Sequence, residues 1–363
     1  MNSHYSRGML WFVLFAGLLS CATAGAQGWT AVDLGTLGGS KSVATAINSS
    51  GQVVGWSYAA GNPNASIAFI TDANGANMRS LGFLAGGTNS IANGINDSGQ
   101  VVGSGDSSAR SVGFITDANG ANMRALDISG QVVTASGINN TGQVVGWTGT
   151  FNSVGGTAFI TGANGAGVTS LGVLSGRQYS KAFRINDAGQ VVGFSYNANP
   201  NSFITYYARG FMTGPNGVGM TDLGALDPAG IGYSSAWGIN AAGQVVGAAD
   251  TASYASHAFL TGASGVGMTD LGTLGGMSSM AYGVNNFGQV VGYSYNAQWT
   301  SYAYVTGING AGMTNLNTLV SLPNGAHLTE ARGINDMGQI VANGSDNHAY
   351  LVSPAPQPAG AGQ

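Results

Sequence analysis

Short apolar segments alternate with turn-forming residues along the whole chain, and they fall into three recurring strings. The first has the form Ile-Asn-x-x-Gly-Gln-Val-Val-Gly, the second is typified by His257-Ala258-Phe259, and the third by Asp270-Leu271-Gly272. Each string occurs seven times, in the same order, at intervals of about 48 residues. The asparagine of the first string is found at Asn48, Asn96, Asn139, Asn186, Asn240, Asn285 and Asn335. The pattern therefore indicates one structural unit repeated seven times.

Each string predicts β-strand. The Gln-Val-Val-Gly segments are short and rich in β-branched residues, and Gly, Asn and Asp separate them from their neighbours. The Asn-x-x-Gly link suits a type I turn followed by a left-handed glycine, which makes a tight hairpin. A unit then reads as a four-stranded antiparallel meander of the length of a β-propeller blade. The small apolar residues throughout are typical of strands covered on both faces.

The two ends of the repeat region predict how the blades close into a ring. Residues 29–35 match the fourth strand of a unit, although no unit precedes them, and residues 348–352 match a third strand with no fourth strand after it. We therefore predict an all-β, seven-bladed β-propeller with four-stranded blades, in which the N-terminal strand completes the last blade and removes both open edges. A single domain is expected over residues 27–353, followed by a disordered tail at 354–363.

The first 26 residues have the pattern of an export signal. Arg7 precedes an apolar run at residues 9–19, and Ala24-Gly25-Ala26 supplies a small-x-small cleavage site. Leu18-Leu19-Ser20-Cys21 also resembles a lipobox, so lipid anchoring at Cys21 is the alternative. Cys21 is the only cysteine, and simple cleavage leaves a mature chain without thiols. We expect an extracellular or periplasmic protein with no transmembrane span in its mature part.

Composition narrows the range of functions. Only 7% of the 363 residues are charged and the net charge is −4, so there is no basic surface for nucleic acid. No phosphate-binding glycine motif is present, and we expect neither a cofactor nor a metal. Acid–base groups are few, and the one cluster that would support a catalytic alternative is His327, Glu330 and His348. The simpler interpretation places these residues in strands and solvated loops.

The lengths of the connections separate the two faces of the predicted disc. Asn to Gln is always four residues and the aromatic to Leu always 12, whereas the other two connections vary from copy to copy. Alternate connections of a meander lie at the same end, so both constant turns share one face and both variable loops share the other. Variable loops on a rigid scaffold usually carry function. The predicted ligand-binding residues are Tyr179, Tyr196, Tyr206, Tyr207, Tyr233, Tyr254 and Trp299. Tyrosines that only fill gaps between loops are the alternative.

Three motifs carry a resemblance to a known family. The strings at residues 257–259, 270–276 and 283–292 resemble the bacterial HAF-repeat extracellular proteins, which take their name from the His-Ala-Phe triplet. The resemblance covers residues 29–352 and implies an exported bacterial protein with no established activity. It transfers no site residues.

The leading functional hypothesis is an exported, monomeric, non-enzymatic binding or adhesion module that uses the variable-loop face. A glycan or an extracellular protein is the expected partner. The alternatives are a propeller enzyme acting on polysaccharide and a passive envelope or matrix component.

Overall fold

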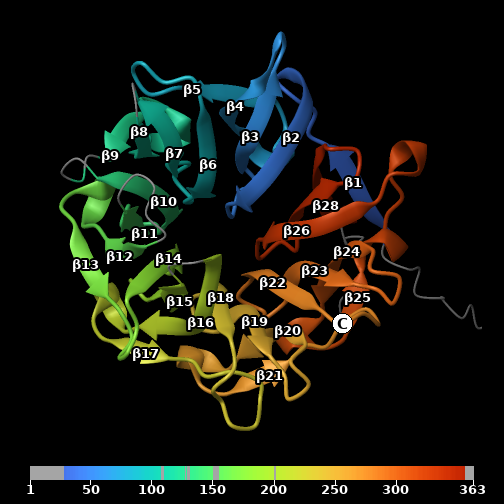
Figure 1. Cartoon of the computed structure of the whole chain (residues 1–363). Helices are drawn as coiled ribbons and strands as arrows, with labels where there is room; N and C mark the ends of the chain where they lie inside the picture. Colours follow the sequence, from blue (N-terminus) through green and yellow to red (C-terminus); the bar gives the residue numbers. More distant parts are fainter. Residues whose placement is uncertain are drawn as a thin grey trace, which may run out of the picture.

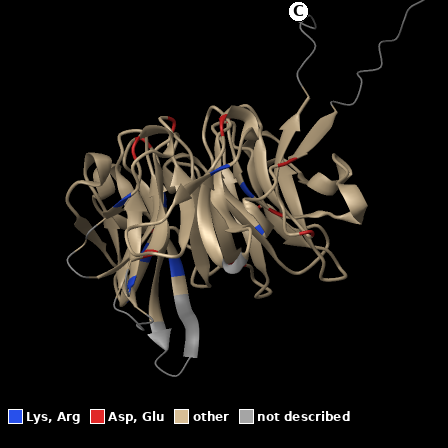
Figure 2. Ribbon diagram, turned by 90° about the horizontal axis from the view of Figure 1, so that it is seen from above, with Lys and Arg blue, Asp and Glu red and all other residues tan. Residues whose placement is uncertain are grey.

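Seven four-stranded antiparallel sheets surround a central axis, as the sequence predicts (Figure 1). In the computed structural model, the described residues are 28–107, 110–126, 128, 131–149, 155–199 and 202–355, without the side chains of 62–64, 198–199 and 202–207. Seen edge-on, the sheets form a disc on which charged residues are sparse (Figure 2). The fold is therefore the seven-bladed β-propeller expected from the repeats.

The strands follow the repeat order. Blade one contains β2 (Gly38–Ile47), β3 (Val53–Ala59), β4 (Asn62–Ile70) and β5 (Arg79–Gly82). Blade two contains β6 (Ser90–Ile95), β7 (Val101–Ser107), β8 (Arg110–Ile115) and β9 (Arg124–Leu126). Blade three contains β10 (Val132–Ile138), β11 (Val144–Gly149), β12 (Gly156–Ile160) and β13 (Thr169–Gly172). Blade four contains β14 (Tyr179–Ile185), β15 (Val191–Asn199), β16 (Ser202–Thr213) and β17 (Met220–Asp222).

The remaining blades have the same plan. Blade five contains β18 (Ser234–Ile239), β19 (Val245–Asp250), β20 (Ser256–Thr261) and β21 (Met268–Asp270). Blade six contains β22 (Ser279–Val284), β23 (Val290–Tyr295), β24 (Ser301–Thr306) and β25 (Met313–Asn315). Blade seven contains β26 (Leu328–Ile334), β27 (Ile340–Gly344), β28 (Ala349–Pro354) and β1 (Trp29–Asp33).

Single turns of 3-10 helix are the only helical elements among the described residues. Six of them link the third and fourth strands: η1 (Ala73–Gly75), η2 (Ala118–Gly120), η3 (Ala163–Gly165), η4 (Pro215–Gly217), η5 (Ala263–Gly265) and η6 (Ile308–Gly310). The other two, η7 (Leu316–Thr318) and η8 (Pro323–Gly325), follow β25. In the described part of the chain, no helix is long and apolar enough to cross a membrane.

Blade seven is assembled from both ends of the chain. β1 pairs antiparallel with β28, with Trp29 opposite Pro354 and Asp33 opposite Tyr350. The pairing continues beyond the strands, because the Ala355 N–H donates to the Gly28 carbonyl at 2.6 Å. The ring closes as predicted, and β28 ends at Pro354, the first residue of the predicted tail. The predicted export signal at 1–26, with Cys21, and residues 356–363 lie outside the described residues.

The apolar core lies between blades. Each blade buries one large aromatic of its third strand almost completely, at Phe69, Phe114, Phe159, Phe211, Phe259, Tyr304 and Tyr350. In one cluster, Val54 and Ile70 of blade one pack with Ile95, Val101 and Phe114 of blade two. Burying such a side chain stabilises the folded state by about 2 kcal/mol relative to leaving it in water. Every blade therefore depends on its neighbour for its own burial.

Candidate functional site

The two constant turns of each blade do lie together on one face. In blade one the Gly75 N–H donates to the Gly51 carbonyl at 3.0 Å, and the same bond recurs in blade two between Gly120 and Gly99. Gly51 has a φ of +78°, and a Cβ there would come within about 3 Å of the Asn74 backbone. Glycine is therefore required by both backbone conformation and space. We call this surface, formed by residues 48–52, 71–78 and their equivalents, the fixed-turn face.

A closed ring of asparagines surrounds the axis on the fixed-turn face. The Nδ2 of each repeat asparagine donates to the backbone carbonyl of the equivalent asparagine in the next blade, at 3.0–3.2 Å. The last of these bonds runs from Asn335 back to Asn48. All seven side chains are 3–7% exposed. We call them the asparagine ring.

Each ring asparagine is fully hydrogen-bonded. In blade four, Asn186 Nδ2 also donates to Gln190 Oε1 at 2.8 Å, and Asn186 Oδ1 accepts from the Gln190 N–H at 3.0 Å. Further bonds link blades through glutamine: Gln52 and Gln339 donate to Asn119 and Asn74. Because buried amides must be paired, this arrangement explains why Asn and Gln recur in every copy. Their role is to join blades.

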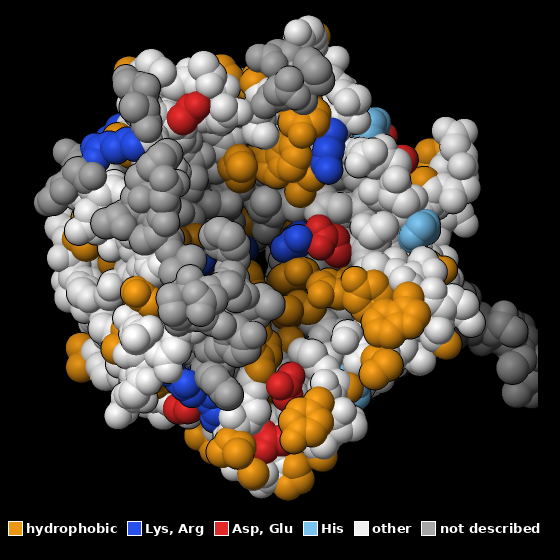
Figure 3. All heavy atoms as spheres, viewed as in Figure 1, with side chains coloured by type: hydrophobic (Ala, Val, Ile, Leu, Met, Phe, Trp, Pro, Cys, Tyr) orange, Lys and Arg blue, Asp and Glu red, His pale blue; other side chains and the backbone are white. Residues whose placement is uncertain are grey.

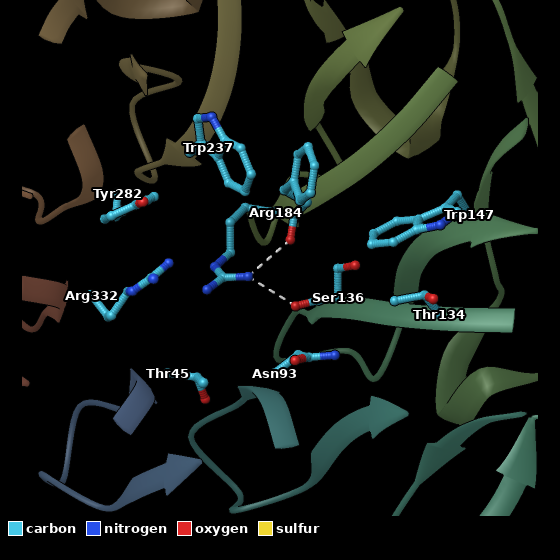
Figure 4. A pocket seen from close by; sticks show the side chains of 10 residues that line it. Thr45, Asn93, Thr134, Ser136, Trp147, Arg184, Trp237, Tyr282 and Arg332 are labelled. Atoms are coloured by element: carbon cyan, nitrogen blue, oxygen red, sulfur yellow. Dashed lines mark hydrogen bonds between the residues drawn. The ribbon is translucent and has the colours of Figure 1, made fainter. Parts of the chain in front are cut away.

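The opposite surface, which we call the variable-loop face, opens into the central channel. A hollow of about 220 Å³ lies at its centre (Figure 4). One residue of each inner strand, three positions before the ring asparagine, lines it: Thr45, Asn93, Ser136, Phe183, Trp237, Tyr282 and Arg332. A deeper hollow of about 200 Å³ shares Thr45, Arg184 and Arg332 with it. A position whose chemistry differs from copy to copy thus faces the channel.

Two guanidinium groups lie in this channel. Arg184 Nη1 donates to the carbonyls of Ser136 at 2.9 Å and Phe183 at 3.0 Å. Burial, with a contribution from the charge of Arg332, lowers the pKa of Arg184 to about 10, so Arg184 remains protonated at neutral pH. Arg332 pairs with Glu330 at 2.8 Å and lies 4.2 Å from the centre of the Tyr282 ring.

Aromatic rings lead outward from the channel across the variable-loop face. Phe183 stacks on Trp237 with centroids 4.1 Å apart, and Trp237 meets Tyr282 edge-on at 5.8 Å. The series continues through Tyr293 and Tyr295 to Trp299, at centroid distances of 5.7–5.8 Å. We call Tyr282, Tyr293, Tyr295 and Trp299 the aromatic track. Figure 3 shows a band of hydrophobic side chains running outward from the centre of this face.

The structure places the predicted ligand-binding residues in different surroundings. Trp299 ends the aromatic track and is 62% exposed. Tyr179 packs against Tyr196 at 5.5 Å, and Tyr196 is only 1% exposed, so it supports the wall of the site from behind. Burial raises the pKa of Tyr196 to about 12. Tyr206 and Tyr207 lie in β16, but their side chains are outside the described residues.

Tyr233 and Tyr254 line a separate hollow on blade five. This hollow, of about 630 Å³, lies between the loops around residues 227–233 and 250–254. Tyr254 is 89% exposed at the tip of a tight turn with a φ of +60°, and Asp250 accepts from the Tyr233 N–H at 3.1 Å. The five predicted residues whose side chains are described, four tyrosines and Trp299, therefore do not form one surface.

The three residues of the catalytic alternative have separate partners. Glu330 is bound by Arg332 and by Asn343 Nδ2 at 3.0 Å, whereas the His327 ring packs on Tyr302 at 5.3 Å. His348 pairs with Asp33 at 2.7 Å. In the part of the chain that the structure describes, no three His, Cys, Asp or Glu side chains gather in a way that could hold a metal. Among the described residues, no contact brings these three side chains together as a proton-transfer site.

The histidine of the His-Ala-Phe string has a structural partner. His257 Nδ1 lies 2.9 Å from Asp270 on the fourth strand, and His348 pairs with Asp33 in the same way. In blade four, Arg209 takes this position and contacts Asp222. In these three blades, a side-chain contact to a carboxylate thus links the third strand to the fourth.

Sequence reasoning did not select Arg184, Trp237 or Tyr282, and it assigned the repeat asparagines to a hairpin turn without foreseeing their hydrogen bonds between blades. A signal for Arg184 exists, since the repeats read Gly-Ile-Asn or Gly-Val-Asn in five copies and Arg184-Ile185-Asn186 in the fourth. At Gly238, the equivalent position in blade five, a Cβ would come within 2.8 Å of the Tyr282 carbonyl. Because five copies have glycine at this crowded position, an arginine there indicates that the channel is built differently at blade four.

No family model matches the chain, and no curated protein matches it in sequence. Solved structures of similar fold include an oligogalacturonate lyase in complex with manganese, 10% identical over 92% of this chain and 95% of that one, with a TM-score of 0.57. A virginiamycin B lyase from Staphylococcus aureus is 9% identical over 90% and 99% of the two chains, with a TM-score of 0.54. YCF48 bound to D1 peptide is 9% identical over 92% and 98%, with a TM-score of 0.53. At such low identity these likenesses establish the propeller fold alone.

Proposed function

We propose that this chain is an exported HAF-repeat protein that works as a binding module and takes a glycan on the aromatic track of its variable-loop face. The observation that carries the proposal is the track itself. Four aromatic rings at regular spacing lead from the channel to the rim, and none of them is fully buried. The flat C–H faces of sugar rings pack on such side chains, and the hydroxyls of tyrosine supply hydrogen bonds.

The asymmetry of the two faces supports the same proposal. The asparagine and glutamine amides of the fixed-turn face are occupied by hydrogen bonds within and between blades, whereas the rings of the track lie in a row beside one another. Trp299 holds a φ of +60°, an uncommon conformation for a bulky residue, in a turn closed by its N–H bond to the Asn296 carbonyl. This turn holds the Trp299 ring out in solvent at the rim of the face.

A glycan array tests the proposal. The purified mature chain is compared with Trp299→Gly, which relieves the positive φ while removing the ring, and with Tyr254→Gly. The second substitution is a matched control, because Tyr254 has the same φ of +60° at the tip of an equivalent turn in blade five but is not part of the track. We expect binding to fall about tenfold or more in Trp299→Gly and to persist in Tyr254→Gly.

Two outcomes contradict the proposal. If the wild-type chain binds no glycan, the carbohydrate assignment is wrong. If Tyr254→Gly loses binding and Trp299→Gly retains it, the ligand lies in the blade-five hollow instead of on the track.

A further inference from the structure

We infer that the glycan bound by this face carries a carboxylate, as in a uronic acid, and that Arg184 and Arg332 receive this group at the inner end of the aromatic track. The inference rests on the proposed function and names the class of sugar. Four observations support it: the position of the two guanidinium groups, their incomplete pairing, the charge of the channel and the way the track ends there.

The two arginines approach one space from different blades. Arg184 comes from β14 and Arg332 from β26, and Figure 4 shows both guanidinium groups pointing into the same hollow. Both residues line the two axial hollows that share this part of the channel. Like charges repel more strongly away from bulk water, and an anion bound between the two guanidinium groups would offset this repulsion.

Neither guanidinium has all its donors occupied. Arg184 uses Nη1 for two backbone carbonyls, and in the described structure it has no carboxylate partner. Arg332 pairs through Nη2 with Glu330, while its buried Nε donates to no acceptor among the described residues. A buried donor without a partner is costly and uncommon. The free donors of a guanidinium match a planar carboxylate, which accepts two parallel bonds.

The local charge balance is positive. Among the described residues, Glu330 is the one carboxylate that contacts these guanidinium groups, and Arg332 and Asn343 already hold both of its oxygens. Lys181 adds a further cation over the Trp147 ring, which lines the same hollow, at 5.1 Å. The chain as a whole is acidic, with a net charge of −4. The channel mouth is therefore a local exception to the charge of the molecule.

The track selects a sugar acid over other anions. Its innermost ring, Tyr282, lies directly under the Arg332 guanidinium, at 4.2 Å. A chain of sugar rings stacked along Tyr293 and Tyr295 would bring its terminal ring to this point. Only a ligand with both a flat hydroxylated body and a carboxylate uses both parts of the site.

A glycan array printed in matched pairs tests this inference. Each uronic-acid glycan is placed beside its carboxyl-reduced form, which keeps the same rings and linkages without the charge, and poly-glutamate is added as an acidic peptide. We expect the acidic member of a pair to bind about 10- to 100-fold more tightly, as charge-assisted hydrogen bonds imply. Arg184→Gly, which installs the glycine of five other copies, should remove this preference.

The control is Arg124→Thr. It makes the same change of charge away from the channel, and it installs the threonine found at the equivalent position of four other copies, Thr169, Thr221, Thr269 and Thr314. It should leave the preference unchanged. Equal binding to both members of every pair, with loss in Trp299→Gly, overturns the carboxylate inference and leaves the proposed function intact. Binding to poly-glutamate as strong as to any glycan also overturns it, and no binding to any glycan overturns both.

Discussion

The two faces of this disc are built from the same seven copies, yet one face has the same key residues in every copy and the other does not. On the fixed-turn face, one chemical solution is repeated without exception: an asparagine, a left-handed glycine and a glutamine in every blade. On the variable-loop face, the residue three places before that asparagine changes from threonine to tryptophan to arginine. Positions that must satisfy a neighbouring copy of themselves cannot vary independently. Positions that face the channel can vary, and there the chain carries the aromatic and charged side chains that could bind a ligand.

The largest expected effect comes from opening the ring on which both faces depend. Deleting Trp29–Asp33 leaves β28 with an unpaired edge and removes one strand of blade seven. We expect the free energy of unfolding to fall by about 4 kcal/mol or more. Urea unfolding followed by circular dichroism measures it, and adding residues 28–37 as a free peptide should restore part of the loss. Unchanged stability would show that the closing strand is dispensable.

A single substitution in the asparagine ring should be the next most damaging. Asn186→Ala leaves the Asn240 carbonyl and two groups of Gln190 without their partner. A loss of about 3 kcal/mol is expected, since each buried group left unpaired costs roughly 1–3 kcal/mol. Asn77→Gly is the control: Asn77 is an exposed residue with a φ of +49°, and four other copies have glycine there. Equal melting temperatures for the two variants would contradict a structural role for the ring.

On the variable-loop side, a smaller and pH-dependent effect is expected at Asp106. Its carboxylate accepts N–H bonds from Thr88 at 2.6 Å and Asn89 at 2.7 Å. Burial acts to raise the pKa of Asp106, but the hydrogen bonds from Asn89 and Thr88 outweigh it and lower the pKa to about 2. Because the folded pKa lies below the unfolded one, the stabilisation is present above about pH 4 and is lost as the pH falls through about 2.

The measurement is the stability of Asp106→Asn against wild type across this range. The difference should be about 1 kcal/mol or less at pH 6, because the site is largely solvated and screened, and it should shrink towards pH 2. A difference that stays constant with pH would contradict the assignment to the carboxylate charge.

The smallest effect is expected from the residue in the most recognisable string. His257→Val removes a partly exposed contact with the Asp270 carboxylate, and blade two has Val112 at this position. Exposed pairs contribute about 0–1 kcal/mol, so thermal unfolding should change little. A loss above 2 kcal/mol would mean that this pair joins the outer strands more strongly than its exposure suggests.

The sequence was enough to predict the blades, their number, the closure by β1 and the division into two faces. Each rests on local rules: β-branched runs, a turn that needs a positive φ at Gly51, and constant spacing. The candidate site was harder to predict from the sequence. Neighbouring strands determine that Tyr196 is buried and Trp299 exposed, and no local pattern distinguishes them. Arg184 and Arg332 lie 148 residues apart in sequence, and they come close only because the inner strands of all blades surround one central channel.

The pairing of β1 with β28 also has a consequence for the order of folding. Its hydrogen bonds join residues 323 positions apart, as between Thr30 and Ser353, so the last contact of the ring spans almost the whole chain. A ribosome must complete residue 354 before blade seven can form, and loop closure over such a distance is slow. Until then the chain has an unpaired edge at each end and stays an incomplete arc. A polypeptide of this design closes its ring in one late step, after the third strand of its seventh repeat has been synthesised.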